Sequence, residues 1–199
     1  SAASDVYKRQ DVAPPASDDE HGTAFATLAL PMAFVGMISA VVLSTQVHGR
    51  RPRRFLASGA LAIIAGFIMA AVMRFGFDVV DGSYWEVVGA LSLAIAGVSM
   101  CLLGMESKFG YVGPGIGAVF VMFLSNPLSG MQTGPEWLPS PWGTIGQFLP
   151  LGAAGSALRS VGFFDGAGWG IHGRVLVCWA LLGIALAGWS AWTASGRSH

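Results

Sequence analysis

Five long apolar runs constrain the fold of this chain more than any other feature. Each run approaches or exceeds the length of about 20 residues that a helix needs to cross the hydrocarbon core of a bilayer. The runs contain no Asp, Glu, Lys, Arg or His. We therefore predict an all-α integral membrane protein with five transmembrane helices. The runs cover residues 23–45, 55–73, 87–105, about 109–125 and 175–194.

The composition supports this class. The chain has 199 residues, of which 53% are hydrophobic and 11% are charged, whereas a soluble domain has about 25% charged residues. A soluble all-helical core is the alternative, and the shortage of charge disfavours it. The formal net charge is zero, so we expect no basic surface that binds nucleic acid.

The segment between the fourth and fifth runs, residues 126–164, is apolar but repeatedly interrupted by proline. Proline inside a helix removes a backbone hydrogen bond and clashes with the preceding turn. The longest arm without proline, Leu151–Phe164, is too short to span a bilayer. We therefore predict an external re-entrant helical hairpin before the last helix, with two short arms that enter and leave on the same side. Its prolines are Pro127, Pro135, Pro139, Pro141 and Pro150.

Lys and Arg predict the orientation, because short cytoplasmic loops are enriched in these residues. The loop Gln46–Arg54 carries four arginines within five positions. We therefore place this loop and the C-terminus in the cytoplasm, and the N-terminus and the hairpin outside a bacterial plasma membrane. The four arginines are Arg50, Arg51, Arg53 and Arg54.

The remaining segments are predicted to be turns, loops and a tail. Glu106–Lys108 is predicted to be a tight turn, and the glycine-rich segment Asp165–Arg174 a loop. Residues 1–22 are predicted to be a disordered tail before a transmembrane domain at residues 23–199. The opening SAASDVYKRQ resembles translated vector sequence. We therefore expect residues 1–10 to be foreign and the rest of the tail to be the end of an external region, as in a fragment.

Several kinds of chemistry are disfavoured by the residues present. A P-loop needs a Gly-Lys-Ser/Thr step, and neither lysine, Lys8 or Lys108, follows a glycine. The uncharged runs disfavour an intramembrane enzyme and a proton-coupled pump, because ionisable groups inside a membrane are usually functional. The histidines and the two cysteines show no metal-ligand spacing. We therefore predict no catalytic, cofactor-binding or metal-binding residue in this chain, and no enzyme activity of its own.

Two features allow two interpretations each. The arginine loop is either a docking segment for a cytoplasmic partner or a topology signal that attracts anionic lipid. Ala62, Gly66 and Ala70 form a stripe of small residues with four-residue spacing. Such a stripe lets helices approach closely, and it serves either packing within the chain or a dimer face.

The hairpin also allows two interpretations. It is either an external gate at the mouth of a pathway or a structural lid anchored by tryptophans at the membrane interface. Glu136 and Arg159 are its only charged residues. The candidate gate residues are Pro135, Glu136, Trp137, Pro139, Pro141, Trp142, Pro150 and Arg159.

The order of these elements resembles the C-terminal part of ABC transporter permeases of the type-2 exporter class, and of the related YhgE/Pip-type membrane proteins. The closest resemblance is in the sequence NPLSG…PEWLPSPWGTIGQFLPLGAAGSALRS. The resemblance as a whole covers about residues 23–194. It implies a six-helix family pattern whose first helix has no counterpart in this sequence. It also implies an external hairpin before the last helix and a coupling helix within Gln46–Arg54. This loop departs from the pattern because it is short and very basic.

The resemblance implies the membrane-spanning permease part of an exporter, driven by a separate cytoplasmic ATPase subunit. It also implies a second permease copy and contact with membrane lipids, with no cofactor bound by this chain. The uncharged spans are compatible with a hydrophobic substrate, which the sequence does not identify. The alternative is a YhgE/Pip-like membrane scaffold or accessory protein of secretion that transports nothing.

Overall fold

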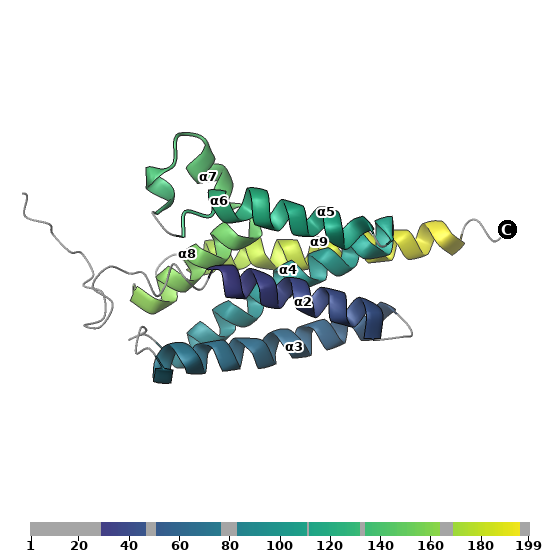
Figure 1. Ribbon diagram of the computed structural model, residues 1–199, viewed down its shortest axis with the longest axis horizontal. Coiled ribbons are helices and arrows are strands. Elements are labelled where there is room, and N and C mark those ends of the chain that lie inside the picture. The colour runs from purple at the N-terminus through teal and green to yellow at the C-terminus, as the bar shows by residue number, and fades with distance from the viewer. Residues whose placement is uncertain are drawn as a thin grey trace, which may run out of the picture.

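The structure, a computed structural model, describes residues 29–46, 51–76, 83–110, 112–131, 134–163 and 169–195, and no strand occurs among them. The helices lie side by side along one long axis (Figure 1). The predicted tail at residues 1–22 and Arg50 lie outside the described residues.

Three of the described helices are long and apolar enough to cross a membrane. They are α3, Arg51–Ala71, which continues as the π-helical turn η1, Val72–Gly76; α4, Tyr84–Phe109; and α9, Trp169–Ser195. Each contains one of the predicted runs, so three of the five predicted spans have a matching long helix. These three candidate transmembrane helices indicate a multi-pass membrane protein.

The other two predicted runs coincide with shorter apolar helices. The helix α2, Ala29–Gln46, has an apolar part at Ala33–Leu43. The fourth run forms one continuous helical rod, Val112–Leu128. The rod consists of α5, Val112–Val119; the π-helical η2, Phe120–Ser125; and α6, Asn126–Leu128. Both helices are shorter than the three candidate spans, so the count of five spans stays a prediction.

The outer faces of the helices suit contact with lipid. Large apolar side chains such as Ile64 on α3 and Leu181 on α9 are more than half exposed, and an exposed apolar surface of this extent marks contact with a membrane or a partner. Exposed tryptophans lie near both ends of the helices, at Trp85 near the start of α4 and Trp192 near the end of α9. Tryptophans are typical of the membrane–water interface.

Two predicted boundaries are wrong. The predicted turn Glu106–Lys108 is helical, because α4 continues to Phe109 and ends at Gly110, whose φ of 65° suits glycine. The predicted loop Asp165–Arg174 is helical from Trp169 onward. The segment Trp169–Arg174 contains glycines but no proline, so every residue keeps the backbone amide that a helix needs as a hydrogen-bond donor. Its Gly173 is buried within the packed helix.

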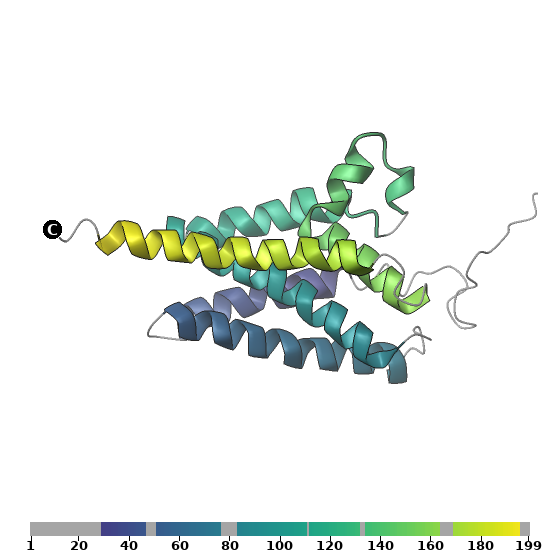
Figure 2. The ribbon, with the colours of Figure 1, turned by 180° about the vertical axis from the view of Figure 1, so that it is seen from behind.

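The helix α4 is the centre of the bundle. It packs against α2, α3, α5 and α9, and also against α8, Pro150–Phe163, of the hairpin segment. Figure 2 shows α9 running along the bundle in front of α4. Two glycines bring these helices into backbone contact: a Cβ atom added at Gly104 would lie 2.5 Å from the Cα of Gly183. Close approach through small residues is a common way for membrane helices to associate.

The small-residue stripe of α3 is also used within the chain. Ala62 and Ala70 are 1% exposed, and Gly66 packs against Ser92 of α4. Nearby, the hydroxyls of Ser58 and Ser99 form a buried hydrogen bond of 2.7 Å between α3 and α4. Of the two interpretations of this stripe, the structure therefore supports packing within the chain.

The helices alternate in direction, so the bundle has two chemically different ends. The ends of α2, α4 and α9 and the starts of α3 and α5 lie together at the right of Figure 1, which we term the arginine end. The segment after α6 lies at the left, which we term the hairpin end. Arg51, Arg53 and Arg54 begin α3 rather than a loop.

Candidate functional site

The predicted hairpin, residues 126–164, starts too early, because Asn126–Leu128, with Pro127, forms α6 and belongs to the helical rod Val112–Leu128. The segment that follows α6 is broken into short helices, as predicted. After a turn at Ser129–Met131 it forms the 3₁₀ helix η3, Pro135–Trp137; then α7, Trp142–Gln147; and then α8. The longest of these described pieces, α8, has 14 residues, fewer than a spanning helix needs. Pro135 and Pro150 each stand at the start of a helix, where the missing amide hydrogen costs little.

The turn between α7 and α8 is anchored inside the bundle. Pro150 and Leu151 are fully buried. The backbone amide of Leu151 donates to the hydroxyl of Ser125 at 3.0 Å, and the indole Nε1 of Trp179 donates to the carbonyl of Phe148 at 2.8 Å. Trp179 lies well inside α9, and Ser125 lies near the end of the helical rod Val112–Leu128. The turn therefore extends from the hairpin end into the interior of the bundle.

A polar network joins the parts of the hairpin segment. The side-chain amide of Gln147 donates to the carbonyl of Ser129 at 3.2 Å and accepts a hydrogen bond from the hydroxyl of Ser156. Arg159 donates from Nη1 to the carbonyl of Gly130 at 3.1 Å. Gly130 has a φ of 63° and lies in close contact with the backbone of Pro135. These contacts tie the turn after α6, α7 and α8 into one unit.

The candidate gate residues divide into two groups. Arg159 and Pro150 belong to the inner, packed part, and Pro135 is partly buried. Burial lowers the pKa of the Arg159 guanidinium, and the negative charge of Glu136 opposes this shift. The other five lie at the rim of the segment, and all of them are exposed: Glu136, Trp137, Pro139, Pro141 and Trp142.

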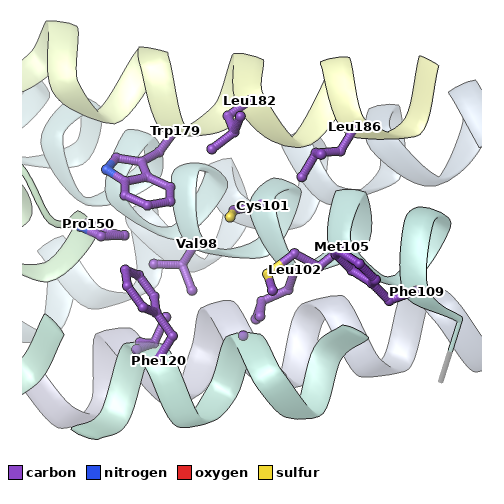
Figure 3. A pocket seen from close by; sticks show the side chains of 12 residues that line it. Val98, Cys101, Leu102, Met105, Phe109, Phe120, Pro150, Trp179, Leu182 and Leu186 are labelled. Carbon is purple, nitrogen blue, oxygen red and sulfur yellow. The ribbon is translucent and has the colours of Figure 1, made fainter. Parts of the chain in front are cut away.

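An apolar pocket of about 330 Å³ lies directly beside the buried turn. Its walls come from α4, from α5 and η2, and from α9, and Pro150 closes it toward the hairpin end (Figure 3). Trp179, Leu182 and Leu186 point into it from α9, and Phe120 points in from the opposite side. Within the described part of the chain no charged side chain lines the pocket, so it is suited to an apolar molecule.

The arginine segment splits into a paired and an exposed part. Arg54 donates from Nη1 to a carboxylate oxygen of Glu106 at 3.3 Å, and both side chains are mostly buried. Arg53 is exposed at the surface. The ammonium of Lys108 lies 4.6 Å from the ring centre of Trp189. Arg50, and the side chain of Arg51, lie outside the described residues. Among the arginine side chains of this segment that the structure describes, Arg53 is therefore more accessible to a partner than Arg54.

Sequence reasoning missed the residues that anchor the hairpin. Gln147 was detectable in principle, because an amide side chain in an apolar segment needs hydrogen-bond partners. Ser125 and Trp179 carry no such signal, because each lies within an apolar run and its partner is far away in the sequence. The pocket also has no sequence signal, since it depends on how α5 and α9 diverge over α4.

Comparison with known protein families, curated protein sequences and solved structures finds no match for this chain. The resemblance to exporter permeases therefore stays a prediction from the sequence.

Proposed function

We propose that this chain is the membrane-spanning permease part of an ABC-type exporter that moves an apolar substrate outward and is driven by a separate ATPase. The observation that supports this proposal best is the uncharged pocket beside the hairpin turn. It is bounded by α4 and α9, two of the candidate transmembrane helices, and it lies where a substrate would be held on the way through the membrane.

In this mechanism the hairpin closes the external side. Pro150 covers the pocket toward the hairpin end, and Ser125 and Trp179 hold the turn in place. Release to the outside requires α8 or α9 to move so that Pro150 leaves the mouth of the pocket. A second copy of the chain would complete the pathway, as the exporter resemblance implies.

Force would enter at the arginine end. Arg53 is exposed in the first turn of α3, and in this proposal it contacts the ATPase subunit. Arg54 would act as a positioning residue, because its ion pair with Glu106 joins the start of α3 to the end of α4. A push on the first turn of α3 is then transmitted to α4, which packs against the helices that enclose the pocket.

The test is purification of the tagged chain from its own cells in a mild detergent, followed by identification of a subunit with a P-loop and measurement of ATP hydrolysis. Replacing Arg50, Arg51, Arg53 and Arg54 by alanine should remove that subunit and the activity. Arg174→Ala, an exposed arginine at the opposite end, is the control and should retain both. Purification without a P-loop subunit would contradict the proposal.

A non-transporting scaffold is the second candidate. The observation that favours it is the dense anchoring of the hairpin, in which Gln147, Ser156 and Arg159 link its parts. A scaffold needs a fixed shape and no nucleotide-driven subunit. It would therefore co-purify with membrane partners that lack a P-loop, and its arginine variants would keep their function.

A further inference from the structure

A second apolar groove runs along α9 outside the pocket. It has a volume of about 610 Å³ and lies between the first half of α9 and the exposed ring of Phe148 on the hairpin turn. Val175, Cys178 and Leu182 line its apolar part, and Arg174 lines it near the start of α9, with Ile171 about one turn closer to the hairpin end of the bundle. The groove thus combines a long apolar wall with one cation.

The groove adjoins the pocket but is a separate hollow. Trp179 and Leu182 line both of them. From Arg174 to Leu182, the last residue of α9 that lines the groove, the helix advances by about 12 Å, since each helical residue adds about 1.5 Å. One leaflet of a hydrocarbon core of about 30 Å is about 15 Å thick. The groove therefore covers most of the thickness of one lipid leaflet.

The cation lies where a lipid head group would be. Arg174 is exposed, and within the described residues its guanidinium has one hydrogen bond, from Nε to the carbonyl of Gly170 at 2.8 Å. That bond holds the side chain at the first turns of α9 and leaves the terminal nitrogens directed at no acidic group of the described chain. Guanidinium groups bind phosphate strongly through paired hydrogen bonds.

We propose that this groove binds one acyl chain of an anionic phospholipid, with the lipid phosphate at Arg174 and the chain alongside Cys178, Trp179 and Leu182. Arg174 complements the negative charge of the lipid phosphate, and the uncharged wall of the groove suits the acyl chain. The ring of Phe148 covers the chain from the hairpin side. The site does not depend on ATP-driven transport, because a scaffold with the same groove would bind the same lipid.

The test is native mass spectrometry of the purified full chain in detergent with added dioleoyl phosphatidylglycerol. Dioleoyl phosphatidylcholine is the neutral comparison with the same acyl chains. The wild type should retain one phosphatidylglycerol at concentrations at which phosphatidylcholine is not retained. Arg174→Gln should weaken this binding about fivefold, the contribution of one arginine near an anionic lipid surface. Arg174→Lys should stay within about twofold of the wild type.

Two further variants separate the site from general adhesion of lipid. Leu182→Trp adds bulk to an exposed position in the groove and should abolish retention while the protein stays folded by circular dichroism. Arg53→Gln removes an exposed arginine at the other end of the bundle and should leave the retention of phosphatidylglycerol unchanged. Equal retention of both lipids, or equal losses in Arg174→Gln and Arg53→Gln, would overturn the proposal. Formation of a dimer that excludes lipid would overturn it as well.

Discussion

The backbone contact between α4 and α9 determines how far these helices stand apart, and Gly183→Ala tests it. A Cβ atom at Gly183 would lie 2.7 Å from the backbone nitrogen of Cys101 and closer still to the carbonyl of Met100. Ordinary contact begins at 3.4 Å, so the helices must separate by at least about 0.7 Å. A gap of this size forfeits about a quarter to a half of each contact energy across it.

The cost follows from this separation. Overpacking a well-packed core usually costs about 1–3 kcal/mol, and a backbone carbonyl cannot rotate away as a side chain can. We therefore expect Gly183→Ala to lose about 2–3 kcal/mol of unfolding free energy. Gly188→Ala is the matched control, because nothing lies within 4 Å of a Cβ at that exposed position of the same helix. It should gain up to about 1 kcal/mol from helix propensity.

The assay is unfolding of the purified protein in mixed micelles of dodecyl maltoside with increasing sodium dodecyl sulfate, followed by circular dichroism. The difference between the two variants should be about 3 kcal/mol. Equal midpoints for Gly183→Ala and Gly188→Ala would refute the close contact between α4 and α9, and with it the position of α9 as one wall of the apolar pocket.

Two more predictions concern the hairpin anchor and the arginine end. Ser125→Ala leaves the buried backbone amide of Leu151 without its hydrogen-bond acceptor. It should lower the free energy of unfolding by about 1–3 kcal/mol and speed hydrogen exchange around Leu151. Ser140→Ala, at an exposed position, should change neither quantity. Arg54→Ala and Glu106→Ala should each cost about 1–3 kcal/mol, because each leaves the other, mostly buried side chain without its ion-pair partner. A double-mutant cycle measured by the same unfolding assay should show positive coupling between them, and a coupling of zero would exclude a positioning role for this pair.

The sequence allowed the helical class and the long helices to be predicted, because apolar length and missing charge act locally along the chain. Helix α3 shows this: its uncharged run at residues 55–73 lies within one continuous helix. The prolines also correctly predicted a broken segment after α6. These signals are properties of single segments and need no knowledge of their neighbours.

Other features depend on contacts between distant segments. The start of α9 at Trp169 was missed because its glycines suggested a loop, whereas packing can stabilise a helix against such local preference. The depth of the hairpin turn depends on Ser125 and Trp179, which are 26 and 31 residues from their hydrogen-bond partners. The pairing of Arg54 with Glu106 joins positions 52 residues apart, so the sequence pattern could not separate it from a free arginine.

The most direct test of the central claim, an exporter-type permease with an external re-entrant hairpin, is cysteine accessibility in whole cells. Single cysteines are introduced as Ser140→Cys and Ser195→Cys, with Cys101 and Cys178 replaced by alanine. We predict that a membrane-impermeant maleimide labels the cysteine at position 140 in intact cells and reaches position 195 only after permeabilisation. Labelling of position 195 from outside would make the hairpin a sixth span and would contradict the proposed architecture.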